Sequence, residues 1–182
     1  KMGIRGVPNV PIFLDNVRVP AENMIGPEGE AFKACMRILD LNRPTIGATA
    51  VGLAQGAINL ATDYARERVQ FNRPIGEFQG IQFMLADMQM QTEAARCMLY
   101  DCTRMADAQD WDGFSAKASM VKCFASDVAM KVATDAVQVF GGAGYMRDFP
   151  VERFMRDAKI NQIFEGTNQI QRLVIARHML KG

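Results

Sequence analysis

The chain has few residues with which to bind a metal ion and none of the long apolar runs that cross a membrane. It has one histidine, His178, and its four cysteines form no CxxC motif and no Cys–His pair at metal-ligand spacing. No apolar run reaches the ~18 residues of a membrane span, and no signal peptide is visible. We therefore expect no metal site, no membrane span and a reduced, intracellular compartment. The cysteines themselves are predicted to be small core residues, namely Cys35, Cys97, Cys102 and Cys123.

An excess of one charge is also lacking. The chain has 21 Lys and Arg against 20 Asp and Glu, so a nucleic-acid partner, which requires a basic surface, is not expected. Its 49% hydrophobic content is typical of a globular protein, and 182 residues fit one domain with a short appendage. Because the chain begins at Lys1 rather than at methionine, we interpret it as a fragment or a processed product.

Residues 1–27 differ from the rest of the chain. They contain four of the seven prolines, and Ile12, Leu14, Val17 and Val19 predict one or two short strands. A single hairpin is marginally stable by itself. We therefore interpret residues 1–27 as the remnant of a sheet that is mostly missing.

Residues 28–182 show helical periodicity and are predicted to form one helical domain. Long helices are expected over 43–69, 81–102 and 116–140, and two shorter ones over 151–159 and 168–180. Short connections between long helices predict an antiparallel bundle. The faces predicted to be buried comprise Ile81, Met84, Leu85, Met88, Ala95, Met98, Leu99 and Cys102 in one helix and Val121, Phe124, Val128, Val132 and Val137 in the next. The thirteen methionines are interpreted either as core residues or as the lining of a flexible apolar groove.

The stretch NQIFEGTNQIQR places Glu165 between an apolar pair and a glycine. An acid before a helix is favoured by the helix dipole, and Thr167 or Asn168 is suited to cap that helix, Asn168 together with Gln171 resembling a capping box. Alternatively, a carboxylate that has lost water beside apolar residues is suited to act as a base. The local pattern leaves both interpretations open.

Two more stretches carry polar or flexible groups. QVFGGAGY, residues 138–145, ends a predicted helix, and its glycines serve either as a C-cap or as bare backbone that binds a phosphate or ribose. In YARERVQFNRPIGEFQ, residues 64–79, arginines surround Phe71. They either complement the helix dipole or form a fork for a pyrophosphate beside an aromatic surface. Arg43 is expected either to pair with Asp40 or to face an anionic ligand.

Taken together and in order, eight stretches resemble the acyl-CoA dehydrogenase family. They are KMGIRG, VRVPAENMIG, LDLNRP, YARERVQF, FQGIQFMLADM, QVFGGAGY, PVERFMRDAK and IFEGTNQIQR. The resemblance implies a mainly α fold, the antiparallel four-helix bundle of the family's C-terminal domain, with a short N-terminal β remnant. Residues 1–27 would then be the last part of the middle β-domain and 28–182 the C-terminal domain. A full member would be roughly twice this size.

The resemblance also implies roles for individual residues. Glu165 matches the base that removes the substrate's α-proton; some branches carry that glutamate beside the arginine matching Arg43, where this chain has Asn42. The positions that match FAD contacts are Arg68, Val69, Gln70, Phe71, Phe78, Gln79, Gln138, Val139, Phe140, Gly141, Gly142, Thr167, Asn168 and Gln169. Those near bound acyl-CoA are Leu39, Asp40, Asn42, Arg43, Gly166 and Arg177. Val7 and Asn9 depart from the serine and threonine that many members have.

The reaction implied is the α,β-dehydrogenation of an acyl-CoA thioester to trans-2-enoyl-CoA, as in fatty acid β-oxidation, with FAD taking the β-hydride. A homotetramer, a dimer of dimers, that passes electrons to electron-transfer flavoprotein is the family pattern. The expected location is the bacterial cytoplasm or the mitochondrial matrix. The alternatives are an acyl-CoA oxidase-like enzyme and an inactive helical oligomerisation or binding fragment. This chain alone is expected to be inactive, because half of the flavin pocket is not encoded in it.

Overall fold

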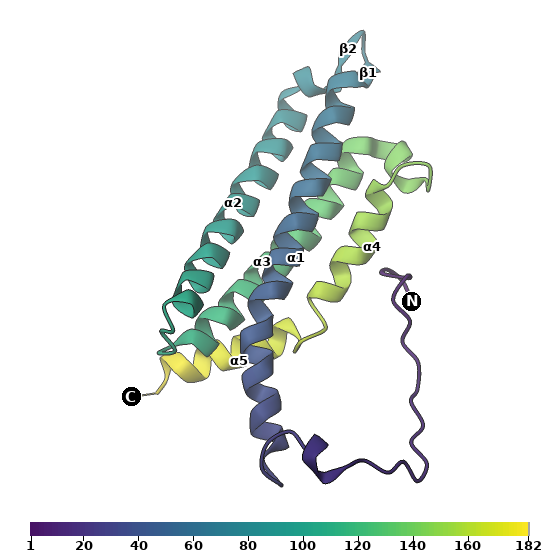
Figure 1. The fold of residues 1–182 in the computed structure, drawn as a ribbon. Coiled ribbons are helices and arrows are strands. Elements are labelled where there is room, and N and C mark those ends of the chain that lie inside the picture. Colours follow the sequence, from purple (N-terminus) through teal and green to yellow (C-terminus); the bar gives the residue numbers. More distant parts are fainter. Residues whose placement is uncertain (182) are drawn as a thin grey trace.

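Five α-helices make up most of the computed structural model, which describes residues 1–181 (Figure 1). Helices α1 to α4 form the predicted antiparallel four-helix bundle, and α5 crosses one end of it, where it contacts α3. The helices are α1 (Ala31–Glu67), α2 (Gln79–Asp107), α3 (Phe114–Phe140), α4 (Val151–Asn161) and α5 (Asn168–Met179). Short 3-10 turns lie at η1 (Ala21–Asn23), η2 (Ile75–Glu77) and η3 (Gly141–Tyr145).

Helix α3 is the centre of the bundle, since it contacts every other α-helix. Its packing against α1 is close because small side chains line the contact. A Cβ atom on Gly47 would lie 2.6 Å from a methyl group of Val121, so only glycine allows this approach. The fully buried alanines around that contact are Ala50, Ala54, Ala57, Ala61, Ala118, Ala129, Ala133 and Ala136.

Three details of the helix prediction are wrong. Helix α2 continues to Asp107, five residues beyond the predicted Cys102. Helix α1 begins at Ala31 instead of Arg43, so Pro44 lies inside it and cannot donate to the carbonyl of Asp40. Pro44 is buried against the bundle, and this packing offsets the lost hydrogen bond. Phe124 is 38% exposed, because Ala125 takes the core position between Val121 and Val128.

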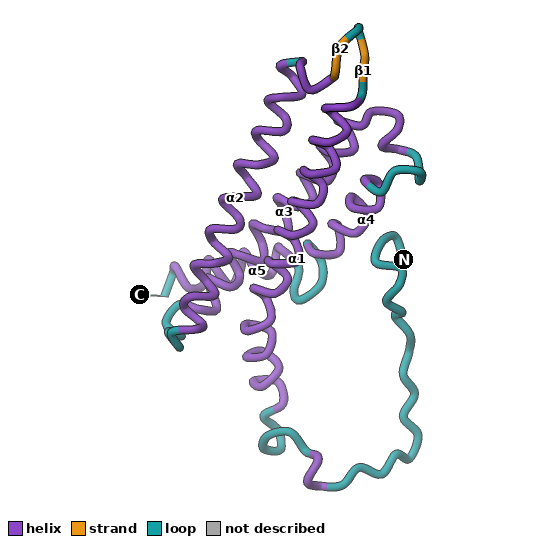
Figure 2. Tube along the Cα trace, turned by 45° about the horizontal axis from the view of Figure 1, so that its top comes forward, coloured by secondary structure: helices purple, strands orange, loops and turns teal. Residues whose placement is uncertain are grey.

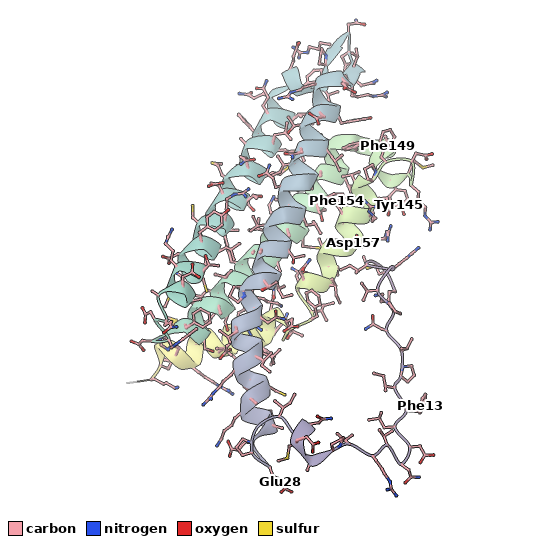
Figure 3. The ribbon with its side chains drawn as sticks, viewed as in Figure 1. Phe13, Glu28, Tyr145, Phe149, Phe154 and Asp157 are labelled. Carbon is pink, nitrogen blue, oxygen red and sulfur yellow. The ribbon has the colours of Figure 1, made fainter. Side chains whose placement is uncertain are left out.

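The strands predicted within residues 1–27 do not form in this structure, where the segment is extended and exposed (Figure 2). A strand requires a neighbouring strand for its backbone groups, and within residues 1–181 no strand pairs with this segment. Only its start is attached: the amide of Ile4 donates to Asp157 on α4 at 2.6 Å. Figure 3 shows Asp157 facing that start and Phe13 standing away from the bundle. The two strands of the described chain, β1 (Val69–Gln70) and β2 (Arg73–Pro74), instead form a hairpin after α1.

The cysteine prediction is half right. Cys102 and Cys123 are buried, whereas Cys35 and Cys97 are exposed. In the part of the chain that the structure describes, no helix combines the length and the apolar character needed to cross a bilayer.

Candidate functional site

Glu165 lies in a tight turn between α4 and α5. Glu165 has φ 56° and Gly166 has φ 86°, so two consecutive residues adopt the left-handed conformation. A non-glycine residue in this region is uncommon, and such strain costs about 1–3 kcal/mol and persists only where the surroundings enforce it. A Cβ atom on Gly166 would lie 2.6 Å from Nε2 of Gln171, so a larger residue would also clash.

The Glu165 side chain is withdrawn from bulk water. It is half-buried, and its Oε2 atom is buried with no hydrogen-bond partner among residues 1–181. Because a carboxylate oxygen without water or a donor is costly to bury, this atom is available for a group that arrives from outside the chain. This state is consistent with the second interpretation of Glu165, a base held for use, while its place before α5 also agrees with the first.

Two buried side chains hold the carbonyl groups of this turn. Nε2 of Gln171 donates to the carbonyl oxygens of Glu165 at 3.3 Å and Gly166 at 2.9 Å. Nζ of Lys122, on α3, donates to the carbonyl oxygen of Gly166 at 2.8 Å. Both side chains are fully buried. The backbone strain of the turn is thus balanced by hydrogen bonds from within the core.

The capping prediction is correct for Thr167 and wrong for Asn168. The Thr167 side chain accepts from the amide of Ile170 at 3.4 Å and so caps α5. Asn168 is the first residue of α5 and is buried; its Oδ1 accepts from Lys122 at 2.7 Å, and its Nδ2 donates to Asp127 at 2.7 Å. Asn168 therefore ties α5 to α3 instead of forming a capping box.

Arg43, on α1, is only 5% exposed and lies near the Glu165 end of the bundle. Its guanidinium pairs with Asp40, which is one of the two outcomes expected, and lies 3.5 Å from the Ser119 hydroxyl on α3. Its Nε atom is buried and has no hydrogen-bond partner in the described part of the chain.

The pKa of Lys122 shows which charged groups lie near its ammonium group. Burial is the main cause that lowers this pKa to about 8. The charges of Cys123 and Asp127 raise the pKa, that of Arg43 lowers it further, and that of Glu165 raises it. Arg43, Lys122 and Glu165 therefore form one electrostatic neighbourhood, built from α1, α3 and the α4–α5 turn.

The opposite end of the bundle contains a cavity that joins the two other candidate stretches. Its lining includes six residues that the resemblance assigned to FAD, namely Arg68, Gln70, Val139, Phe140, Gly141 and Gly142, together with Tyr64, Ile75, Ala143 and Phe149. The ring of Tyr64 stacks on that of Phe140 with centroids 4.0 Å apart and forms part of the cavity wall. We call this group of lining residues the cradle.

The glycines of the cradle have separate roles. Gly141, with φ 60°, is the C-cap of α3, as the first interpretation of this stretch predicted. A Cβ atom on Gly142 would meet nothing within 4 Å, so its backbone stays accessible. Gly144 is a packing residue, since a Cβ atom there would lie 2.6 Å from the carbonyl oxygen of Val137.

The remaining predicted cofactor residues are divided between the two ends. Phe71, 87% exposed, and Phe78 form an edge-to-face pair beside the β1–β2 hairpin, and Arg73 lies 4.2 Å over the Phe78 ring. Val69, Gln79 and Gln138 are exposed and do not line the cradle. Thr167, Asn168 and Gln169 line a separate depression beside α4 and α5. Among the predicted acyl-CoA residues, Leu39 and Asn42 are half-buried on α1, and Arg177 is exposed on α5.

Sequence reasoning missed Lys122 and gave Gln171 the wrong role, since Gln171 bonds to the carbonyls of Glu165 and Gly166 instead of forming a capping box with Asn168. A signal for Lys122 was present, because it falls on the α3 face formed by Ala118, Val121 and Ala125, and a lysine on an apolar face must find oxygen partners in the core. Gln171 has no such signal, since its partners are backbone carbonyls whose position depends on the Glu165 turn.

Comparison with known proteins identifies the family to which the helical bundle belongs. Residues 29–180 match the family model "Acyl-CoA dehydrogenase, C-terminal domain". The chain is 57% identical over its whole length to the probable acyl-CoA dehydrogenase FadE25 of Mycobacterium tuberculosis, and it covers 46% of that protein. It is thus about half as long as such relatives.

Solved structures give the same result. Butyryl-CoA dehydrogenase from Megasphaera elsdenii matches 90% of this chain with a TM-score of 0.87 and 48% identity, over 42% of its own length. A chain in the structure described as the electron transferring flavoprotein of Acidaminococcus fermentans matches 90% of this chain, and 43% of its own, with a TM-score of 0.88 and 51% identity. The chain therefore belongs to the acyl-CoA dehydrogenase family.

Proposed function

We propose that the protein containing this chain is an FAD-dependent dehydrogenase that converts an acyl-CoA thioester to the trans-2-enoyl-CoA, with Glu165 as the base. The observation that carries this proposal is the buried Oε2 atom of Glu165, which lacks a partner within residues 1–181 although the turn around it is firmly held. A carboxylate in this state is suited to accept a proton from a substrate that covers it.

Glu165 is proposed to take the α-proton of the thioester as the Cα–Cβ double bond forms. Positioning a general base in this way typically contributes about 10²–10⁴-fold to the rate. When bound, FAD supplies the acceptor for the β-hydrogen, which leaves as a hydride, a reaction that no side chain can perform.

The cradle fits part of a dinucleotide cofactor. The accessible backbone at Gly142 allows close approach, Arg68 offers a guanidinium fork suited to a phosphate, and the aromatic wall suits a flat ring. The cradle and Glu165 lie at opposite ends of the bundle, where the helix between Arg43 and Glu67 alone spans about 36 Å. This separation favours an arrangement in which the cradle of one chain serves the flavin beside Glu165 of another, and we propose the homotetramer that the family resemblance implies.

Electron-transfer flavoprotein is the proposed electron acceptor, and the similarity to a chain in the Acidaminococcus fermentans structure supports this choice. The test is an anaerobic assay of the complete enzyme with acyl-CoA and an artificial electron acceptor, compared with peroxide release in air. Anaerobic enoyl-CoA formation with little peroxide supports a dehydrogenase. Rapid stoichiometric peroxide would indicate the oxidase-like alternative, and no oxidation with flavin bound would refute the proposal.

A further inference from the structure

A buried lysine is unusual enough to require a reason, and within residues 1–181 Lys122 forms no direct ion pair, although the charges of Asp127 and Glu165 act on it from a greater distance. Its side chain is fully buried, yet it forms none of the salt bridges found within residues 1–181. It is held by two neutral oxygen atoms, the Gly166 carbonyl and Asn168 Oδ1. Burial of an ammonium group without an ion pair is unfavourable, so stability alone does not explain this residue.

The Gly166 carbonyl does not depend on Lys122 for its hydrogen bond, since it also accepts from Gln171 at 2.9 Å. Asn168 Oδ1 lies 3.2 Å from the Ser126 hydroxyl, whose single proton is shared with the Cys123 carbonyl at 3.1 Å. Removal of the ammonium group would therefore leave the Gly166 carbonyl satisfied. What Lys122 adds is a second point of attachment for the Gly166 carbonyl, from α3 rather than α5.

We propose that Lys122 and Gln171 are positioning residues, which we call the base clamp, that hold the strained turn so that Glu165 faces its substrate. Gln171 fixes the turn to α5, and Lys122 fixes it to the centre of the bundle. Two attachments on different helices are needed because two consecutive left-handed residues, Glu165 and Gly166, relax readily once one restraint is lost. This inference rests on the proposed role of Glu165 as the base.

The test uses the complete flavin-loaded enzyme with Lys122→Met. Methionine has a similar length and no donor, so the core stays filled. We expect kcat to fall about 10- to 100-fold with KM within about threefold of wild type, because a displaced base loses rate rather than binding. Exchange of the substrate α-proton with D2O should fall by the same factor. Gln171→Leu removes the other donor and keeps the lysine, and it should also lower kcat and α-proton exchange.

The matched control is Lys131→Met, which changes an exposed lysine on the same helix that pairs with Asp135. It should leave kcat unchanged. Hydrogen exchange, measured by mass spectrometry without substrate, should become faster over residues 163–168 in Lys122→Met and not in the control. Unchanged exchange there, or a kcat within threefold of wild type for both clamp variants, would overturn the base clamp. A wild-type enzyme that exchanges no α-proton would refute the proposed function instead, while the hydrogen-exchange result would still decide whether the clamp exists.

Discussion

The two ends of the bundle have opposite construction. At the Glu165 end, buried polar groups on α1, α3 and α5 bond to one another and to the strained turn. At the cradle end, the chain presents accessible backbone at Gly142 and an exposed arginine, and its rigid part is a stack of aromatic rings. The first end is built to hold one side chain in place, whereas the second presents a surface on which another molecule can lie.

The largest expected effect comes from the end that holds the base. Glu165→Gln in the complete enzyme should lower kcat by at least about 10²-fold, because the amide keeps the shape and cannot accept the α-proton. Bound flavin, measured by its visible spectrum, should remain close to one per chain. A variant with near-normal turnover would show that Glu165 is not the base.

At the cradle end, Arg68→Ala should weaken FAD binding about 10- to 100-fold, the effect of losing a hydrogen bond to a charged group. The control is Arg66→Ala, since Arg66 already pairs with Asp63 on the exposed face of α1. Titration of the apoenzyme with FAD measures both. Equal affinities for the two variants would contradict the assignment of Arg68 to the cradle.

Glu165→Gln and Arg68→Ala together test whether the cradle of one chain completes the Glu165 site of another chain. If the cradle of one chain serves the Glu165 site of another, mixed tetramers of Glu165→Gln and Arg68→Ala chains contain some sites with both native residues. At an FAD concentration that leaves the Arg68→Ala sites mostly empty, mixing should then raise the activity above that of either parent, as a steady-state assay after unfolding and joint refolding would detect. If each chain serves its own site, the mixture is no more active than its parents at that FAD concentration.

Sequence reasoning succeeded where a pattern repeats or a local signal suffices. The helical period predicted α3 to within two residues of both ends and the start of α2 equally well, but it ended α2 five residues early. Thr167 was identified as a cap candidate because a cap depends on neighbours in the chain. The roles assigned to the cradle residues came from family resemblance, since Arg68 and Gly142 are far apart in the sequence. The bonds of Lys122 and Asn168 were missed for the same reason: they join residues more than forty positions apart.

The strand prediction for residues 1–27 failed for a different reason. Ile12 and Leu14 alternate as in a strand, but a strand forms only beside another one, and both side chains are about 80% exposed in this structure. Periodicity predicts which face of an element is apolar and says nothing about whether the chain supplies the surface that covers it.

Glycine substitutions provide a direct comparison of the two ends. Gly166→Ala places a Cβ atom 2.6 Å from Gln171 in a backbone with positive φ, so we expect a loss of about 1–3 kcal/mol in the free energy of unfolding. Gly142→Ala meets open space and should change it by less than about 0.5 kcal/mol. Urea unfolding of the chain measures both. Equal destabilisation would mean that the cradle is as tightly built as the base turn.

The smallest expected effect is the change that the charge of Lys122 causes in the free energy of unfolding as the pH rises. Its pKa is lowered from 10.5 to about 8 in the folded chain, mainly by burial, so between these pH values the unfolded chain binds the extra proton and stability rises with pH. The free energy of unfolding of wild type relative to Lys122→Met should therefore increase by about 1 kcal/mol from pH 7 to pH 9.

The difference in the free energy of unfolding between wild type and Lys122→Met separates the contribution of Lys122 from those of nearby titratable groups. Burial raises the pKa of Cys102 and Cys123, and a raised thiol pKa makes stability fall with pH, opposite to the effect of Lys122. Because both proteins contain these thiols, their contribution largely cancels in the comparison. Urea unfolding at pH 7, 8 and 9 measures the difference. A flat difference would mean that water reaches the ammonium group, and the Glu165 end would then be as open to solvent as the cradle.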